Sequence, residues 1–270
     1  MKALNNIYFG YIEILGYKNF ETKINSYPKE TKEHFLNSLY SRLEGTINSF
    51  KTNSNIIWRR YGDGYVIHSP DENIEYLSEI VKKSARLIAL SLNVSIPLRI
   101  DITQGNLNID EPDSGLTISG PGWTNILKLE SSLNWMGGIL YLPNYDGTHH
   151  PSVQNLIGST NLIKKQDYTQ ETNFTPPIKN GINLFSDKYW FLNWYKILKQ
   201  PKSQLDMSIK NWWSQILPSH GLNEVDGVKE KQRNSIEFAD YCRALLKACE
   251  LVYFSEIDRN IKIGGIQGSD

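Results

Sequence analysis

The chain has 270 residues, of which 40% are hydrophobic and 21% are charged, as in ordinary globular proteins with a sizeable core. Its 29 basic and 29 acidic side chains cancel. This balance argues against a general electrostatic affinity for nucleic acid or for an anionic membrane. We therefore expect neither as a partner, although the balance does not exclude a local basic pocket.

The first part of the chain alternates between strand and helix patterns. Residues 7–15 are dense in aromatic and β-branched side chains and end at Gly16, which predicts a buried strand. Apolar residues at three- and four-residue steps predict an amphipathic helix over about 28–53. The runs "NIIWRRY" and "YVIHS" then flank "GDG", which is the pattern of a β-hairpin.

The next part continues as helix, strand, loop, helix and strand. "NIEYLSEIVKKSARLIALSL" predicts a second long helix, and "IPLRIDITQG" predicts a further strand. We expect a polar loop over 106–119, a short helix over 123–133 and a closing strand at "GGILYLP". Beyond Pro143 the composition shifts, and a helix is expected over about 230–254.

This order of elements predicts an α+β fold of the ferredoxin-like type, with a mostly antiparallel sheet and helices on one face. We expect this domain to occupy residues 1–143. Residues 144–270 are expected to form a largely helical C-terminal extension that serves packing or dimerisation. Four tryptophans in the extension indicate core or dimer packing rather than a platform for stacking bases: Trp190, Trp194, Trp212 and Trp213.

The cysteines and the apolar segments bear on the compartment. Cys242 and Cys249 lie seven residues apart in the predicted helix, about 10 Å from each other, which is too far for a disulfide. They also lack the close spacing of a zinc pair, so we expect reduced thiols. The sequence has neither the pattern of a signal peptide nor an apolar segment of spanning length. We therefore expect a soluble, cytoplasmic protein.

Two carboxylates are predicted to meet at one end of the sheet. In a split βαββαβ sheet the first strand and the hairpin are neighbours, which brings Glu13 near Asp63. Carboxylates at the ends of adjacent strands favour Mg²⁺ or Mn²⁺. The turn "GYKNF" offers the backbone amides at Tyr17 and the side chain of Lys18 for holding phosphates. By itself, Asp63 would also suit a plain turn, because Gly-Asp-Gly is a common turn composition.

Four stretches, in order, resemble class III nucleotidyl cyclases. "YIEILGYKNF" resembles the first-strand motif of this family, "RRYGDGYVI" its metal-binding hairpin, "LRIDITQG" its arginine-containing strand, and "SGPGWTNILKLESS…GGILY" the helix and strand that follow. The resemblance covers residues 7–142. It implies a cyclase fold and an intramolecular phosphoryl transfer, in which the ribose 3′-hydroxyl of a nucleoside triphosphate attacks the α-phosphate and releases pyrophosphate.

The resemblance also implies two divalent cations, Mn²⁺ or Mg²⁺, in each active site. Matched by position, their ligands are Glu13, the backbone carbonyl of Ile14, and Asp63. The family usually has Asp where Glu13 stands, and the extra methylene moves the carboxylate outward. This departure keeps open a second interpretation, a catalytically silent cyclase-like domain that binds a nucleotide or a partner.

Arg59 favours a pyrimidine substrate. Four residues before the hairpin aspartate, adenylyl cyclases typically carry Lys and guanylyl cyclases Glu, whereas Arg59 resembles the Arg or Tyr of the pyrimidine cyclases in the Pycsar antiphage system. A guanidinium fills purine space and donates to pyrimidine carbonyls. The second base-reading position, usually Asp in adenylyl cyclases, falls near Thr117. We expect cyclic UMP made from UTP as an alarm signal in phage defence, with cyclic CMP from CTP as the alternative and a purine cyclase third.

The family builds its active site between two protomers, so the resemblance implies a homodimer with two sites at its interface. Asn125, or its neighbour Thr124, and Lys128 match the positions of an Asn and an Arg that stabilise the transition state. The product is expected to act on a separate effector protein. Arg60 is expected to face the other side of its strand, and Arg99 to be either a phosphate contact or a structural ion pair.

Overall fold

A computed structural model of the chain describes residues 2–51, 54–112, 115–145, 155, 162–163, 188–198, 201–217 and 227–243. The helix expected over 230–254 is present in part, because the described stretch 227–243 is helical throughout. Cys242 is buried and is a free thiol, whereas Cys249 lies outside the described residues.

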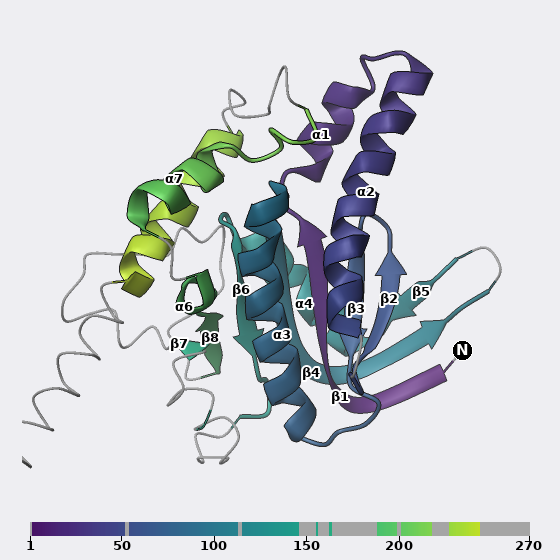
Figure 1. Cartoon of the computed structure of the whole chain (residues 1–270). Coiled ribbons are helices and arrows are strands. Elements are labelled where there is room, and N and C mark those ends of the chain that lie inside the picture. The colour runs from purple at the N-terminus through teal and green to yellow at the C-terminus, as the bar shows by residue number, and fades with distance from the viewer. Residues whose placement is uncertain are drawn as a thin grey trace, which may run out of the picture.

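Among the described residues, one mixed sheet of eight strands forms the centre of the fold (Figure 1). Its strands are β1 (Lys2–Ile14), β2 (Ile57–Tyr61), β3 (Gly64–His68), β4 (Leu98–Asp110), β5 (Thr117–Ser119), β6 (Gly137–Tyr141), β7 (Leu162–Ile163) and β8 (Tyr189–Leu192). They follow the order β2-β3-β1-β4-β6-β8-β7, and β5 pairs with β4 off this path. The β4–β6 pair is parallel and the other pairs are antiparallel, so the prediction of a mostly antiparallel sheet in an α+β fold is confirmed.

The helices lie on both faces of this sheet. They are α1 (Tyr17–Ile24), α2 (Lys29–Lys51), α3 (Glu75–Ser91), α4 (Pro121–Ser132), α6 (Tyr195–Leu198) and α7 (Lys202–Lys210), with a 3₁₀ turn, η1 (Leu92–Val94), after α3. In Figure 1, α2 and α3 lie in front of the sheet, whereas α4 lies behind it. The expectation that helices cover one face therefore holds for α2 and α3 and not for α4.

The alternation of side chains along β1 explains this arrangement. Tyr8 and Ile12 belong to the larger core, which includes buried residues of α2 and α3. Phe9 and Tyr11 point to the opposite face and join a second core with Trp123 of α4. Because both faces of β1 are apolar, helices are needed on both sides to exclude water.

The elements that the sequence did not predict include α1 and the far end of β4 with its partner β5. The short helix α1 follows Gly16, whose φ of 89° is left-handed and easily adopted only by glycine. The strand β4 continues through the expected polar loop as far as Asp110, and β5 pairs with this continuation. Leu107 and Ile109 are buried there, and alternate with the polar Asn106, Asn108 and Asp110. The continuation is therefore an amphipathic strand, although its polar composition favoured a loop.

The described residues after Pro143 share one sheet and one core with the residues before it. Strand β8 pairs with β6, and the four tryptophans predicted to serve packing are buried in the larger core. Trp213 stacks on Phe20 of α1, with ring centroids 4.7 Å apart. The division of the chain at residue 143 into a domain and an extension stays a prediction.

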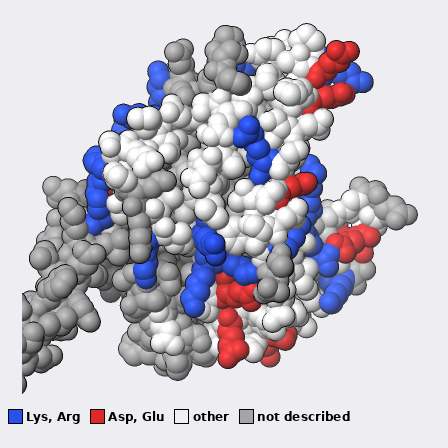
Figure 2. Space-filling view, viewed as in Figure 1, with Lys and Arg blue, Asp and Glu red and all other residues white. Residues whose placement is uncertain are grey.

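Surface charge agrees with the balanced composition. Figure 2 shows Lys and Arg side chains together with Asp and Glu on the face that carries α2 and α3, over a largely uncharged surface. Among the helices that the structure describes, none combines the length and the apolar character needed to cross a membrane.

The close approach of the hairpin to β1 can be tested at Gly64. A Cβ at this position would lie 2.0 Å from the carbonyl oxygen of Ile12. We expect Gly64→Ala to lower the free energy of unfolding by about 1–3 kcal/mol, because backbone must move to accept the methyl group. Urea denaturation measures this change.

A matched control is Gly45→Ala in α2, where an added Cβ has nothing within 4 Å. This change should stabilise the protein by about 0.5–1 kcal/mol, because alanine loses less backbone entropy than glycine in a helix. Equal stability of wild type and Gly64→Ala would contradict the close approach.

Candidate functional site

The end of β1 and the turn of the β2–β3 hairpin lie together, as predicted. Ile12 pairs with Tyr65 in the antiparallel β1–β3 ladder, so the next positions bring Asp63 beside Glu13 and Ile14. The pKa of the Asp63 carboxyl is raised, mainly by burial and also by the negative charge of Glu13, although its own backbone amide acts in the opposite direction. The two carboxylates are thus electrostatic neighbours.

The start of α1 adds backbone donors close to this point. The first intrahelical bonds run from the amides of Asn19 and Phe20 to the carbonyl of Gly16. The amides of Tyr17 and Lys18 precede them, at positions where a helix has no carbonyl partner of its own to offer. The Lys18 side chain is exposed, and the Tyr17 hydroxyl shares a hydrogen bond with Tyr40, 3.1 Å between the oxygens. Such a helix start suits an anion.

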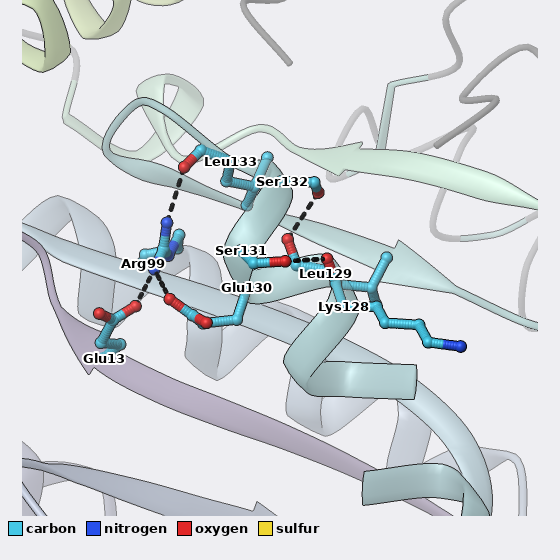
Figure 3. Close-up of polar contacts among 8 residues, drawn as sticks. All are labelled: Glu13, Arg99, Lys128, Leu129, Glu130, Ser131, Ser132 and Leu133. Carbon is cyan, nitrogen blue, oxygen red and sulfur yellow. Dashed lines mark hydrogen bonds and ion pairs between the residues drawn. The ribbon is translucent and has the colours of Figure 1, made fainter. Parts of the chain in front are cut away.

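Glu13 is also bound to a buried arginine on the neighbouring strand (Figure 3). Arg99 of β4 donates through Nη2 to the carboxylates of Glu13 and Glu130, and through Nη1 to the carbonyl of Leu133 at 2.7 Å. Only 6% of the Arg99 side chain is exposed. The interpretation of Arg99 as an ion-pair residue is therefore confirmed, and Glu130 of α4 is a partner that the sequence did not reveal.

A third carboxyl group lies close to this ion-pair cluster. Asp101 is fully buried, and burial raises its pKa well above the usual range, although Arg99 acts in the opposite direction. Its Oδ1 has no hydrogen-bond partner among the described residues. Burial, together with the charge of Glu13, raises the pKa of Glu130 to about 7 despite the charge of Arg99. The site is therefore rich in carboxyl groups that are costly to ionise together.

The two arginines of the hairpin face opposite sides of the sheet. Arg59 forms an ion pair with Glu111, and its Nε donates to His68 Nε2 at 3.4 Å. Arg60 lies over the ring of Tyr40 with 4.2 Å from its Cζ to the centroid, and Nη1 is 3.6 Å from Glu44. The opposite orientation of Arg60 is confirmed, although its side chain packs on α2 rather than standing free in water.

The remaining predicted residues do not join the cluster of Glu13 and Asp63 within one chain. Thr117 is exposed and pairs with Asp110 at the far end of β4. Asn125 is half-buried and Lys128 is exposed on α4. Figure 3 shows the Lys128 side chain directed away from Glu13 and Arg99. Within one chain, the residues predicted to bind metal and phosphate therefore lie together, whereas the other predicted residues lie elsewhere.

Three polar residues next to the predicted ones were missed. His68, Glu111 and Glu130 each contact an arginine that the sequence had singled out. The strand "LRIDITQG" carried a usable signal, because Arg99 and Asp101 alternate with buried isoleucines and must share one face. No group of three or more His, Cys, Asp or Glu side chains in the described part of the chain has the geometry of a metal site.

The solved structures that are similar to this chain include cyclase domains with low sequence identity to it. No protein-family model matches the sequence, and no curated protein matches it significantly. A dimeric guanylyl cyclase domain of the RhoGC fusion protein from Blastocladiella emersonii is 12% identical, covering 71% of this chain and 98% of its own, with a TM-score of 0.44. The guanylate cyclase domain of RhGC from Catenaria anguillulae, in complex with GTP, is 10% identical over 71% and 98%, with a TM-score of 0.44.

The adenylyl cyclase CyaB from P. aeruginosa is 11% identical, covering 71% of this chain and 96% of its own, with a TM-score of 0.43. Identities and scores at this level carry no functional argument. The function proposed below therefore depends on the residues of this chain and on the motifs that they form.

The buried ring of His68, which contacts Arg59, predicts a pH dependence of stability. The His68 ring donates from Nδ1 to the Ser69 carbonyl, which leaves Nε2 as the acceptor for Arg59. Burial lowers the pKa of His68 below its usual 6.5, and the charge of Arg59 acts in the same direction, although the bond to Ser69 opposes it. Below about pH 6.5 the unfolded chain takes up this proton first, so stability falls as the pH falls towards the folded pKa.

We expect urea denaturation above and below pH 6.5 to show a smaller loss of stability in His68→Gln than in the wild type, because glutamine does not titrate. The control is His34→Gln, an exposed change on α2 that leaves the Arg59–His68 contact intact. An unchanged pH dependence in His68→Gln would contradict a buried neutral imidazole.

Proposed function

We propose that the protein is a metal-dependent nucleotide cyclase that converts UTP to 3′,5′-cyclic UMP and pyrophosphate. The observation that carries the proposal is the meeting of the Asp63 turn, the Glu13–Ile14 end of β1 and the start of α1. Paired carboxylates next to helix amides suit a substrate that combines divalent cations with a chain of phosphates. The four ordered motifs in residues 7–142 support the same assignment.

The residues at this point fit a divalent cation. Burial, and in smaller part the charge of Glu13, raises the pKa of Asp63, and a positive charge between the two carboxylates would relieve their repulsion. Glu13, the Ile14 carbonyl and Asp63 would supply oxygen ligands of the kind that Mg²⁺ and Mn²⁺ prefer. Bound cations of this type supply Lewis acidity, which makes a hydroxyl a better nucleophile and neutralises phosphate charge.

Tyr17 and Lys18, at the start of α1, bind and orient the nucleotide. In the reaction the ribose 3′-oxygen gives its proton to water and bonds to the α-phosphorus, while the bond from that phosphorus to the bridging oxygen breaks and releases pyrophosphate. The amides at Tyr17 and Lys18, with the Lys18 ammonium, are suited to hold the triphosphate in line with this attack. Most of the rate acceleration then comes from positioning and charge stabilisation.

Arg59 is the proposed reader of the base. Its guanidinium can donate two hydrogen bonds to carbonyl oxygens, and its bulk leaves less room for a purine. The uncharged Thr117 is proposed at the second base-reading position. CTP is the alternative substrate, because cytosine and uracil share the O2 carbonyl and differ at one exocyclic group.

A homodimer would bring the separated residues together. Asn125 and Lys128 lie on α4, and the Lys128 side chain is directed away from Glu13 of its own chain (Figure 3), so a partner chain related by a two-fold axis is proposed to receive both. Two equivalent sites would result, each with Glu13 and Asp63 from one protomer and Arg59 and Lys128 from the other. The cyclic nucleotide is proposed to act on a separate effector in phage defence, and residues 144–270 to support packing or dimerisation.

One observation favours a second candidate function. Glu13 is ion-paired with the buried Arg99, so the fold accounts for its charge without a cation. A catalytically silent domain that binds a nucleoside triphosphate without cyclising it would retain this contact. Nucleotide binding without pyrophosphate release would identify this second function.

Asp63 provides the first test. We expect Asp63→Asn to lower the rate of UTP cyclisation by roughly 100-fold or more, because the neutral amide is a poor ligand for a hard cation. Purified protein is incubated with Mn²⁺ and each of the four ribonucleoside triphosphates in turn, and the products are separated by chromatography. Wild-type turnover in Asp63→Asn would contradict the metal role, and cyclisation of ATP or GTP alone would contradict the pyrimidine assignment.

Arg59 and Arg60 form a matched pair for testing base recognition. We expect Arg59→Gln to raise the KM for UTP about tenfold, since a hydrogen bond to a charged group contributes about 1.5–3 kcal/mol. Arg60→Gln changes the adjacent residue on the opposite face of the sheet and should leave this KM within about twofold. Steady-state kinetics with UTP and CTP measure both variants, and equal KM values in the two would refute the role of Arg59.

A further inference from the structure

The ion-pair cluster around Arg99 restricts the Glu13 side chain. Glutamate has one more rotatable bond than aspartate, so its carboxylate can occupy more positions at the end of a strand. Here Oε2 of Glu13 accepts from Nη2 of Arg99, and only 22% of the Glu13 side chain is exposed. This contact fixes a carboxylate that would otherwise be free to rotate.

Arg99 is itself held from two further directions. The Glu130 carboxylate also accepts from Nη2, and the Leu133 carbonyl accepts from Nη1 at 2.7 Å. All three partners meet one planar guanidinium, with Glu13 on β1 and the other two on and just after α4 (Figure 3). The donors of a guanidinium lie in one plane at fixed angles. Arg99, held by Glu130 and the Leu133 carbonyl, is therefore a rigid support for Glu13.

The charge of Arg99 has a second consequence for Glu13. The carboxyl groups of Asp63, Glu130 and Asp101 also lie near Glu13. The Arg99 guanidinium places a positive charge among these groups, which offsets the repulsion between them. Carboxylates that bind metals are commonly held by such hydrogen bonds from a second layer of residues, and these partners affect metal affinity strongly.

We propose that Arg99, held by Glu130 and the Leu133 carbonyl, is a positioning residue that fixes the Glu13 carboxylate for a divalent cation. The proposal rests on the metal-dependent function proposed above. It goes beyond that function by assigning a role in the metal site to α4. Glu130 acts through Arg99 and touches neither the cation nor the nucleotide.

The test measures Mn²⁺ binding directly, by following the electron paramagnetic resonance signal of free Mn²⁺ during titration. Arg99→Lys is the informative variant, because lysine keeps the positive charge but cannot contact Glu13, Glu130 and the Leu133 carbonyl in the same way. We expect its Mn²⁺ affinity to fall about 10- to 100-fold, the range seen when partners of metal ligands are changed. The Mn²⁺ affinity of Glu130→Gln should also fall.

Glu79→Gln is the matched control. Glu79 pairs with Lys83 on α3 at 3.1 Å, and its side chain is 27% exposed, compared with 25% for Glu130. The control therefore removes a similar charge from a similar environment that lies apart from the Arg99 cluster. We expect it to keep the wild-type affinity for Mn²⁺.

The outcomes separate this proposal from the proposed function. If the wild type shows no Mn²⁺ binding that depends on Asp63, the metal-dependent function is overturned and the role of Arg99 with it. If the wild type binds Mn²⁺ through Asp63, and folded Arg99→Lys and Glu130→Gln bind it equally well, only the positioning role is overturned. Should Arg99→Lys fail to fold, as removing a buried ion-pair partner can cause, Glu130→Gln decides the question.

Discussion

The pairing of β1 on both edges is the constraint on which the candidate site depends. β1 is hydrogen-bonded to β3 on one side and to β4 on the other, and apolar side chains cover both of its faces. A slip of one residue would exchange the two faces and turn Glu13 away from Arg99. The register that buries Phe9 and Ile12 is therefore also the register that sets Glu13 beside Asp63.

The charged cluster at the end of β1 is better understood as a geometric device than as a source of stability. Moving a guanidinium and several carboxyl groups out of water costs much of what their attraction returns. Asp101 illustrates this cost, since burial raises its pKa and favours its neutral form. Contacts of this kind specify where side chains lie, and here they join β1, β4 and α4 at the place where the chemistry is proposed.

Much of the fold could be predicted because its main elements have clear periods. The apolar steps of α2 and α3 and the "GDG" turn gave the right elements in the right order, and with them the meeting of Glu13 and Asp63. The extension of β4 to Asp110 was not predicted because its exposed face is polar. The helix α1 was not predicted because it is short. Glu130 could not be found from sequence, since its partner lies 31 residues away and the contact exists only after α4 packs on the sheet.

The pairing of β8 with β6 covers an edge of the sheet that would otherwise favour aggregation. Strand β6 is bonded to β4 on one side, and β8 covers its other side. A chain ending at residue 143 would leave the backbone groups of that side unpaired, next to the buried Trp135 and Ile139. Exposed apolar strand edges recruit further strands and lead to aggregation. Strand β8 thus protects this edge of the sheet from pairing with the strands of other chains.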